Sequence, residues 1–306
     1  MNKVSEDIHL QLEQKGYKSR IVSLHHLKDL QQEINAQLAQ RSLNEEFFRE
    51  RLSFFEFNPH ETFPDVVSII IIAFPRPQHK VGFVWNNRTL NLILPPTYVG
   101  YGDIPKQIEN QLTIILTPLG YRVFPARLPL KALAVRSGLA DYGRNNLSYI
   151  RGLGSFFQLA AFYSDLPCEE DHYWREPHMM EICQKCTICL RKCPTLAIIP
   201  DRFLIRAERC LTFHNERGPE YPFPGWIEAK SHNSLIGCMS CQRFCPANEA
   251  VINWVEGDII FDQDETRMIL GMTPLENMPV TMIEKLKQLD LQDSLEILPR
   301  NLGIFT

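Results

Sequence analysis

Hydrophobic residues recur at helical spacing along the first part of the chain. Leu27, Leu30 and Ile34 stand three or four positions apart among Lys, Gln and Glu residues, which is the spacing of an amphipathic helix with one buried face. Gly16 follows an earlier run of the same kind and is a typical helix end. The pattern therefore predicts a helical N-terminal segment over residues 1–58.

A different pattern, with continuous apolar runs between turn signals, covers residues 59–167. The run at 65–74 is rich in isoleucine and valine and ends at a proline, which is typical of a buried strand. An Asn-Asn pair at 86–87 separates two further apolar runs and predicts a hairpin. Helical spacing at 105–119 and another apolar run at 156–163 complete a predicted α/β core of packed strands and helices.

The remainder of the chain falls into two segments. Residues 168–250 hold all the cysteines and are predicted to form a small module organised around them. Residues 251–306 carry one clear helical pattern, at 281–289, and are expected to pack on the α/β core. Two domains are typical for a chain of this length.

Composition and charge narrow the class of protein. The chain of 306 residues is 44% hydrophobic and 22% charged, with a net charge of -4. It contains no block of like charge, which argues against a protein built around a nucleic-acid backbone. The N-terminus is polar, unlike a secretory signal, and the apolar run at 66–74 is too short to span a bilayer. We expect a cytoplasmic protein.

Seven of the nine cysteines lie in two groups, and an eighth, Cys210, lies between the groups. The first group reads C-x2-C-x2-C-x3-C before Pro194, and the second reads C-x2-C-x3-C before Pro246. Thiolates three positions apart on a tight loop can bind different irons of one cubane, and the fourth cysteine, beyond the loop, binds the other cluster. This is the spacing of bacterial ferredoxins with two [4Fe–4S] clusters.

The ferredoxin pattern gives a crossed assignment of the eight ligands, in which the last cysteine of each group binds the cluster held mainly by the other group. Cluster one is predicted to take Cys183, Cys186, Cys189 and Cys245. Cluster two is predicted to take Cys193, Cys210, Cys238 and Cys241.

Zinc sites and disulfides are the alternative interpretations of these cysteines. Zinc sites use C-x2-C pairs separated by a long spacer, whereas three successive cysteines here share the x2 spacing and a fourth precedes a proline. Disulfides need an oxidising compartment, to which nothing in the sequence points. The ninth cysteine, Cys168, is interpreted as an ordinary free thiol.

A glycine-rich loop at 138–155 is the second place where chemistry can reside. Gly138, Gly143 and two further glycines let the backbone turn sharply and approach a ligand closely. Arg144 and Asn145 offer hydrogen-bond donors for carbonyls, amides or carboxylates. The loop is interpreted as a candidate binding site, and a polar turn that binds nothing is the alternative.

Three histidines also bear on the chemistry. His25 and His26 are neighbours in the predicted N-terminal helix, where adjacent side chains do not share a face, so we interpret them as structural or surface residues. His232 lies six residues before Cys238. A hydrogen bond from His232 to a cluster sulfur is a hypothesis that follows from this spacing, since such bonds tune the cluster potential.

The order of these features resembles the epoxyqueuosine reductase family and its relatives, the reductive dehalogenases. The stretch KALAVRSGLADYGRNNLSYI precedes GSFFQLAAFYSDLP and the first cysteine group, and ERC and GCMSCQRFCPANE follow. The resemblance is good over 115–250 and loose over 60–115. The cysteines alone would indicate only a ferredoxin-like module, and the glycine loop at the right distance before them makes the resemblance more specific.

The resemblance implies an α+β fold, in which a nitroreductase-like α/β core is joined to a bacterial ferredoxin-type module with two [4Fe–4S] clusters. It also implies base-off cobalamin as a cofactor and a low-potential electron donor, such as ferredoxin or flavodoxin, as a partner. A flavin is the alternative occupant. Carried over by position, the motif that lines the corrin falls on Gly138, Leu139, Gly143, Arg144 and Asn145.

The chain departs from the family pattern in ways that bear on the substrate. Residues 124–129 contain no carboxylate, where the tRNA-modifying members of the family have a catalytic aspartate. Asp141 and Tyr142 replace a Trp-Ile pair, and Arg144 replaces a lysine. No C-terminal helical repeats of the kind that help to hold tRNA are visible, so tRNA is not expected as a partner.

Three functions remain open. The preferred hypothesis is an iron–sulfur oxidoreductase whose clusters reduce a bound cobalamin that acts on an unidentified small-molecule substrate. The alternatives are an electron-transfer protein that reduces a corrinoid or redox partner, and an epoxyqueuosine reductase with a rearranged acid. Asp141 and Tyr142, on the glycine loop, are preferred to Tyr98 and Tyr101 as catalytic proton donors, because a buried acid or phenol can act as a general acid.

Overall fold

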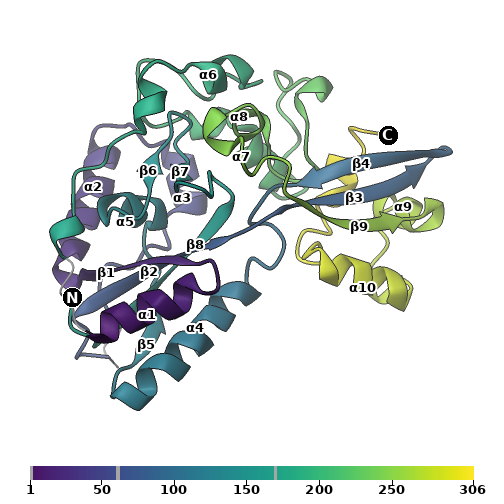
Figure 1. Ribbon diagram of the computed structural model, residues 1–306. Helices are drawn as coiled ribbons and strands as arrows, with labels where there is room; N and C mark the ends of the chain where they lie inside the picture. The colour runs from purple at the N-terminus through teal and green to yellow at the C-terminus, as the bar shows by residue number, and fades with distance from the viewer. Residues whose placement is uncertain (1–2, 60–62, 169–170) are drawn as a thin grey trace. The chain divides into compact units, whose positions relative to one another are not determined.

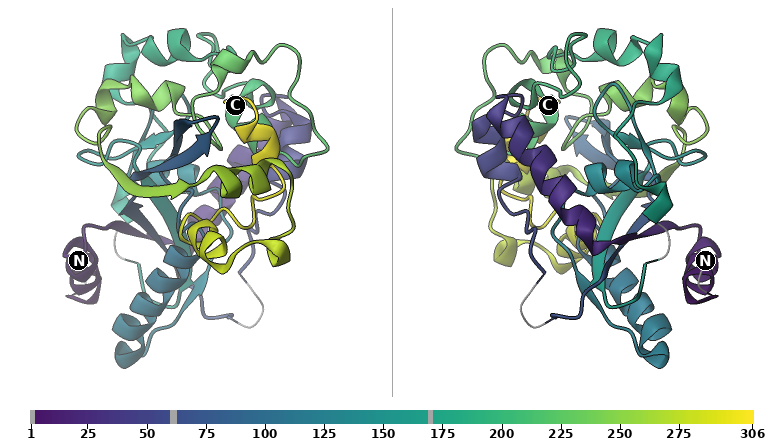
Figure 2. Two further views of the ribbon diagram at one scale, coloured as in Figure 1. Left: turned by 90° about the vertical axis from the view of Figure 1, so that its right-hand side faces the viewer. Right: turned by 90° about the vertical axis from the view of Figure 1, so that its left-hand side faces the viewer.

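The computed structural model describes residues 3–59, 63–168 and 171–306 (Figures 1 and 2). The chain forms two compact units, each made from two stretches of sequence. The first unit combines Met1–Pro75 with Gly102–Cys186, and the second combines Arg76–Tyr101 with Thr187–Thr306. Within the described ranges, no helix is both long and apolar enough to cross a membrane.

An antiparallel sheet of four strands, in the order β1-β2-β8-β5, forms the centre of the first unit (Figure 1). Its strands are β1 (Lys18–Ser23), β2 (Ser68–Pro75), β5 (Val123–Pro125) and β8 (Phe157–Ser164). A separate two-stranded ribbon consists of β6 (Asp141–Tyr142) and β7 (Ser148–Tyr149). The strands predicted at 65–74 and 156–163 are therefore confirmed.

The central strand β2 is buried on both faces, which explains its run of isoleucines. Ile71 belongs to one hydrophobic core, with residues of α2 (Leu27–Ala39) and α5 (Leu130–Arg136). Ile70 belongs to another, with residues of α1 (Lys3–Glu13) and α4 (Asp103–Leu116). Successive side chains of a strand point to opposite faces, so a continuous apolar run fills both cores.

The helices of this unit are α1 (Lys3–Glu13), α2 (Leu27–Ala39), α3 (Glu45–Arg51), α4 (Asp103–Leu116) and α5 (Leu130–Arg136), with the 3-10 helices η1 (Leu24–His26), η2 (Thr117–Leu119), η3 (Asp171–Tyr173) and η4 (Glu181–Gln184).

The expectation of a helical segment over 1–58 requires a correction, because β1 interrupts it. The six residues of β1 pair with β2 from Lys18 opposite Ala73 to Ser23 opposite Ser68. β1 is short and lies between two segments with helical periodicity. Its strand conformation is stabilised by pairing with β2, about fifty residues further along the chain, rather than by its own sequence pattern.

The second unit is built on a three-stranded sheet in the order β4-β3-β9. Its strands are β3 (Gln78–Trp85), β4 (Arg88–Leu94) and β9 (Val255–Phe261). Its helices are α6 (Ile188–Lys192), α7 (Leu211–Glu216), α8 (Ser240–Arg243), α9 (Gln263–Leu270), α10 (Val280–Gln288) and α11 (Leu298–Leu302), with the 3-10 helices η5 (Ala207–Arg209), η6 (Ala229–Ser231), η7 (Pro246–Asn248) and η8 (Leu275–Asn277). One hydrophobic core packs α9, α10 and α11 against β3, β4 and β9.

The hairpin predicted at 86–87 is confirmed, since Asn86 and Asn87 both adopt positive φ (48° and 58°) between β3 and β4, as a tight hairpin turn requires. The unit boundaries nevertheless differ from the predicted segments. The hairpin was placed in a core of residues 59–167, with 251–306 packing on that core, but β3 pairs in parallel with β9 inside the second unit. Pairing between strands so far apart in sequence leaves no local signal.

Candidate iron–sulfur site

The two prolines that follow the cysteine groups shape the backbone at the last cysteine of each group. Cys193 ends α6 with ψ 112°, and Cys245 precedes η7 with ψ 123°. A residue before proline is driven away from helical ψ by the proline ring. Pro194 and Pro246 therefore keep the last cysteine of each group out of helical conformation, and α6 packs against α8.

The structure brings Cys193, Cys210 and Cys238 together from three separate segments. Burial raises the pKa of the Cys210 thiol to about 11, and the nearby Cys238 and Cys193 raise it further. Thiolates crowded in this way would repel one another, so the thiols keep their protons without a metal, and the positive charge of a bound iron centre would stabilise the deprotonated ligands. All nine cysteines are free of disulfides. This donor set fits a [4Fe–4S] cluster, and the approach of Cys193 to Cys210 is what the crossed assignment requires.

The side chain of Asn233 donates a hydrogen bond to a predicted cluster ligand. Its Nδ2 lies 3.3 Å from Cys238 Sγ, and its Oδ1 accepts from the backbone N–H of Met239 at 2.7 Å. His232 was the donor hypothesised from sequence. Its ring instead packs against Phe223, with the centroids 4.7 Å apart, and burial together with the charge of Arg300 lowers its pKa to about 4. The sequence hypothesis named His232 rather than Asn233, because the distance in sequence from Cys238 does not show which of two neighbouring side chains points toward the sulfur.

We expect Asn233→Ala to make the reduction potential of cluster two more negative. A hydrogen bond to a ligand sulfur stabilises the reduced, more negative cluster, and a net loss of about 1 kcal/mol corresponds to roughly 40 mV for a one-electron couple. A redox titration followed by electron paramagnetic resonance measures the shift. Ser240→Ala is the control, since Ser240 Oγ accepts from the same Asn233 amide at 2.9 Å. Equal potentials in the wild type and Asn233→Ala would contradict the assignment.

Tyr98 lies beside the second cysteine group and is held there by two neighbours. Its hydroxyl donates to the carboxylate of Glu216. Gly237 has a φ of +74°, and a Cβ atom there would come within 2.4 Å of the Tyr98 hydroxyl oxygen, so only glycine fits before Cys238. Burial raises the pKa of Tyr98, and Glu216, Cys210 and Cys238 add to the effect. The phenol therefore keeps its proton at neutral pH.

The glycine loop is joined to the segment that enters the first cysteine group. The Tyr142 N–H donates to His178 O at 3.1 Å, and the Met180 N–H donates to Tyr142 O at 2.8 Å. The guanidinium of Arg144 donates to two backbone carbonyls of the group itself, Cys183 O and, at 3.1 Å, Cys186 O. The loop thus holds the backbone of two predicted ligands of cluster one.

Arg144→Met should therefore weaken cluster one selectively. Methionine keeps much of the aliphatic volume but donates nothing to the carbonyls of Cys183 and Cys186, so the ligand backbone is less fixed. We expect the variant to lose about half of its iron, that of one cluster out of two, during aerobic exposure that leaves the wild type intact. Arg151→Met, which removes an exposed arginine from the same loop, is the control. Identical iron loss in both variants would show that Arg144 does not stabilise the site.

The other candidate residues of the loop have distinct surroundings. Tyr142 is buried in a hydrophobic core, and burial and Glu33 raise its pKa. The Asp141 carboxylate, whose side chain is 38% exposed, pairs with Arg175 at 2.7 Å and with His178 at 2.8 Å. Asn145 is buried and donates to the Tyr149 hydroxyl at 2.8 Å. Asn145 therefore shapes the loop, while Asp141 remains accessible.

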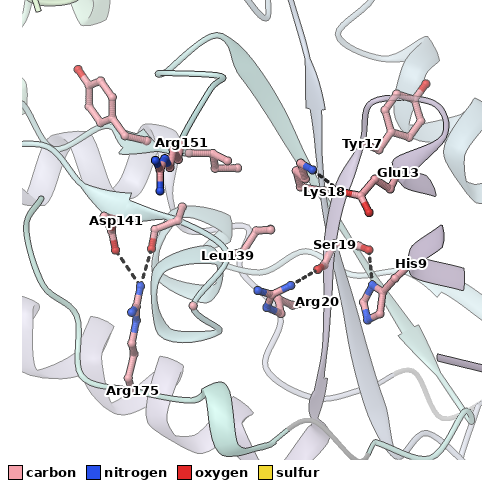
Figure 3. A pocket seen from close by; sticks show the side chains of 14 residues that line it. His9, Glu13, Tyr17, Lys18, Ser19, Arg20, Leu139, Asp141, Arg151 and Arg175 are labelled. Atoms are coloured by element: carbon pink, nitrogen blue, oxygen red, sulfur yellow. Dashed lines mark hydrogen bonds and ion pairs between the residues drawn. The ribbon is translucent and has the colours of Figure 1, made fainter. Parts of the chain in front are cut away.

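A polar pocket of about 340 Å³ lies within the first unit, between β1 and the glycine loop (Figure 3). Gly138, Leu139 and Asp141 line it on the loop side, and Gly138 has a φ of +71°. Its charged lining consists of four cations, Lys18, Arg20, Arg151 and Arg175, and two carboxylates, Glu13 and Asp141.

The basic lining of the pocket gives it a net positive charge and makes it suited to an anion. Arg20 lies over the ring of Tyr173 at 4.7 Å, whereas Lys18 is neutralised by Glu13 at 2.5 Å. Gly143, Arg144 and Asn145 are not among the residues that line the pocket. Sequence reasoning missed Lys18 and Arg20 because it placed them in a helix. The adjacent β-branched residues Ile21 and Val22 in KSRIVS were the available signal for a short strand.

Comparisons with known proteins agree with this arrangement. Residues 182–248 match the model of a 4Fe-4S double cluster binding domain. The epoxyqueuosine reductase of Aliivibrio fischeri is 29% identical over 199 residues, which is 62% of this chain and 52% of that enzyme. The epoxyqueuosine reductase of Cyclobacterium marinum is 36% identical over 129 residues, 42% of this chain and 40% of the enzyme.

This chain is a sequence relative of the epoxyqueuosine reductases. It spans about half the length of the curated relatives that it matches. The resemblance inferred from the sequence is confirmed, and so is the presence of a domain for two [4Fe–4S] clusters.

Solved structures of epoxyqueuosine reductases show the same fold. The enzyme of Streptococcus thermophilus superposes with a TM-score of 0.67 at 20% identity, covering 99% of this chain and 80% of that one. An epoxyqueuosine reductase bound to an epoxyqueuosine-modified tRNA stem loop superposes with a TM-score of 0.68 at 19% identity, with coverage of 99% and 80%. The predicted α+β fold, with a dicluster module joined to a mixed core, is confirmed.

Proposed function

We propose that this protein is an iron–sulfur reductase of the epoxyqueuosine reductase type, and that epoxyqueuosine in tRNA is its first candidate substrate. The observation that carries the proposal is the junction between the glycine loop and the first cysteine group. Arg144 donates to Cys183 O and Cys186 O, so the loop and a cluster segment form one structural element. The sequence relatives support the substrate, and in this respect they favour tRNA more than the sequence features alone did.

Cobalamin is the proposed second cofactor, and the pocket beside the loop is compatible with part of it. Cobalamin carries a phosphodiester in its nucleotide tail, and Arg20 and Arg151 supply cations suited to bind it, since Lys18 pairs with Glu13 and Arg175 with Asp141. The pocket is too small for a whole corrin, so it would hold an anionic portion only. A flavin with its phosphate is the alternative occupant. When bound, the two clusters supply one-electron transfer and cobalamin supplies a strongly reducing cobalt centre.

The residues of this chain divide the remaining tasks. Gly138 and Leu139 line the pocket, and Arg144 fixes the first cysteine group rather than a ligand. Asp141 is the proposed proton-handling group because it is accessible and lies 2.8 Å from His178 Nε2, a ring nitrogen that can share a proton with the carboxylate. Tyr142 keeps its proton, since burial raises its pKa, and its role is to pack the loop against the core. A low-potential donor such as ferredoxin or flavodoxin is the proposed source of electrons.

The test is conversion of epoxyqueuosine to queuosine in tRNA by the cluster-reconstituted protein with cobalamin and a low-potential reductant, measured by mass spectrometry of the nucleosides. We expect conversion, and we expect Asp141→Asn to slow it at least about 100-fold, the usual contribution of a general acid. Tyr142→Phe, with its hydroxyl outside the proposed chemistry, should retain most of the activity. Cobalamin binding without conversion would reject the tRNA substrate.

A second function is favoured by one departure of this chain from the epoxyqueuosine reductase pattern. Residues 124–129 contain no carboxylate, whereas the Bacillus subtilis epoxyqueuosine reductase has been solved with its catalytic aspartate loop swung out of the active site. A cobalamin-dependent reductase for a small molecule that needs no acid from this segment is therefore the alternative. Introducing an aspartate there, as Ala126→Asp, should increase queuosine formation if the lost acid is the limiting feature.

A further inference from the structure

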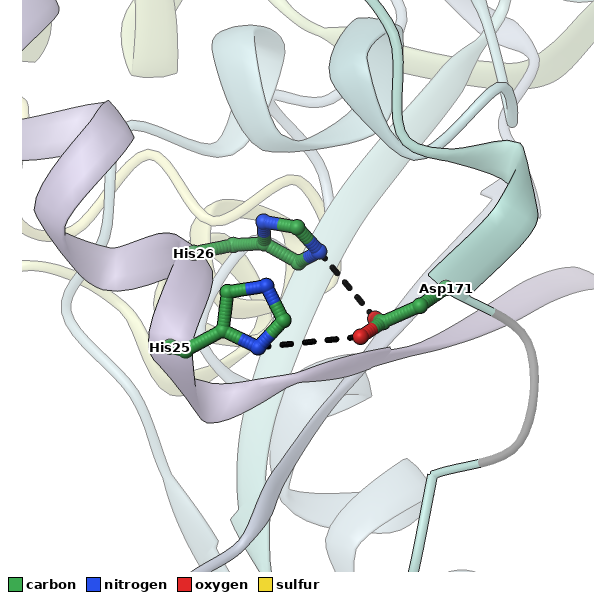
Figure 4. A group of neighbouring side chains, drawn as sticks. All are labelled: His25, His26 and Asp171. Atoms are coloured by element: carbon green, nitrogen blue, oxygen red, sulfur yellow. Dashed lines mark hydrogen bonds and ion pairs between the residues drawn. The ribbon is translucent and has the colours of Figure 1, made fainter.

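A group of metal-binding side chains lies in the first unit, apart from the cysteine groups. His25 and His26 come from η1 and Asp171 from η3, and one potential ligand atom of each lies within 4.8 Å of the others (Figure 4). In an α-helix these neighbouring histidines would face apart, which is why the sequence predicts a structural or surface role for them. The helix here is a single 3-10 turn, and the two rings lie 3.9 Å apart and both face Asp171.

The distances between these atoms suit a bound ion. His26 Nε2 is 3.1 Å from Asp171 Oδ1, and His25 Nδ1 is 3.6 Å from Asp171 Oδ2. A tetrahedral zinc ion with bonds of about 2.0–2.1 Å holds its ligand atoms about 3.3 Å apart. The distances from the two imidazole nitrogens to the Asp171 carboxylate lie on either side of that value, and all three ligand atoms lie within 4.8 Å of one another.

The surroundings of His26 provide an independent argument. Its second nitrogen, Nδ1, lies 3.2 Å from Asp29 Oδ2, which also accepts from Trp174 Nε1 at 2.8 Å. The ring of Trp174 stacks on His26 with the centroids 3.9 Å apart. A carboxylate that accepts from the non-ligating nitrogen is the usual partner of a metal-bound histidine, since it fixes the tautomer and the ring orientation.

The Asp171 carboxylate faces the two histidines and is held in place by the backbone. His26 Nε2 lies 3.1 Å from Asp171 Oδ1. Asp171 Oδ1 additionally accepts from the Ser23 N–H at 2.9 Å, so this carboxylate is fixed in place.

We propose that His25, His26 and Asp171 bind a divalent first-row metal ion, and that zinc fits best. Two imidazoles and one carboxylate are a zinc ligand set, with water in the fourth position. The ion would attach η3, just upstream of the first cysteine group, to the start of α2. Cys168 Sγ lies 3.7 Å from Asp171 Oδ1 and is a further donor near the site.

Zinc and iron contents of untagged, cluster-reconstituted protein at pH 8 test the proposal. The protein is equilibrated with chelator-buffered zinc, desalted and analysed by inductively coupled plasma mass spectrometry. We expect about one zinc per chain beside a full complement of iron, and at least tenfold weaker binding in His25→Gln and Asp29→Asn, in line with the 10–100-fold cost of losing an outer carboxylate. The iron content shows that zinc has not replaced a cluster.

His25→Gln is suited to this test because its side chain is 63% exposed, so the substitution leaves the fold intact. His172→Gln is the matched control, since His172 also lies in η3 but packs its ring against Tyr173. It should bind zinc like the wild type. The proposal is overturned if the wild type binds no zinc while its iron is complete, or if His25→Gln binds zinc as tightly as His172→Gln. Neither result depends on reductase activity, so the zinc proposal and the proposed function are tested independently of each other.

Discussion

Replacing Cys189 and Cys193 together by serine should remove both clusters, whereas replacing Cys189 and Cys245 together should remove only one. In the crossed assignment the first pair contributes a ligand to each cluster, although the two residues are four positions apart. The second pair contributes two ligands to the same cluster, although they lie in different groups. The approach of Cys193 to Cys210 supports this division.

Iron analysis distinguishes the two double variants. With about four irons per cluster, the wild type should hold about eight, the Cys189/Cys245 variant about four and the Cys189/Cys193 variant close to none. Cys168→Ser is the control, because it removes the one cysteine outside the groups and should leave the iron unchanged. An uncrossed arrangement would give the reverse order for the double variants, with the Cys189/Cys193 variant keeping more iron.

Arg300→Met should destabilise the second unit more than the loss of any exposed ion pair. Arg300 lies on α11, and its guanidinium donates to five backbone carbonyls at 2.7–3.2 Å. The acceptors are His214, Asn215, Arg217, Gly218 and Tyr221. Several of these carbonyls are those of the last turn of α7 and the residues after it, which have no helical partner of their own, and an arginine at a helix C-terminus also complements its dipole.

The expected cost is about 3 kcal/mol or more, since several charge-assisted hydrogen bonds are lost and their carbonyls stay partly buried. That corresponds to a fall in melting temperature of roughly 5–10 °C. Because α7 begins directly after Cys210, cluster two should be lost first during heating. Arg267→Met is the matched control: Arg267 pairs with Asp264 at the surface and should change stability by less than about 1 kcal/mol. Equal melting temperatures for the two variants would contradict the role given to Arg300.

The elements that could be predicted from sequence are those whose signal is local. The isoleucine run of β2 is buried on both faces, and this continuous apolar run predicts a strand without information from the rest of the chain. Asn86 and Asn87 indicate a hairpin because few other residues adopt positive φ at both turn positions. The cysteine spacing indicates the clusters because most of the ligand positions follow from the geometry of two short loops.

The elements that could not be predicted depend on partners distant in sequence. β1 is a strand because β2 lies beside it, and β3 belongs to the second unit because β9 pairs with it. Arg144 and Arg300 bind backbone carbonyls, which every residue has, so the sequence around an acceptor carries no trace of the donor. The choice of Asn233 over His232 depends on the path of one loop, which spacing does not specify.

An anaerobic titration of the cluster-reconstituted protein with cob(II)alamin, followed by electron paramagnetic resonance, tests the central claim most directly. The claim is that this chain is a two-cluster reductase with its own cobalamin site. It predicts a saturable change of the cobalt signal to the base-off form at about one equivalent, with both cluster signals retained. A cobalt signal unchanged across the titration, with iron content and cluster signals intact, would contradict the claim and indicate an electron-transfer protein.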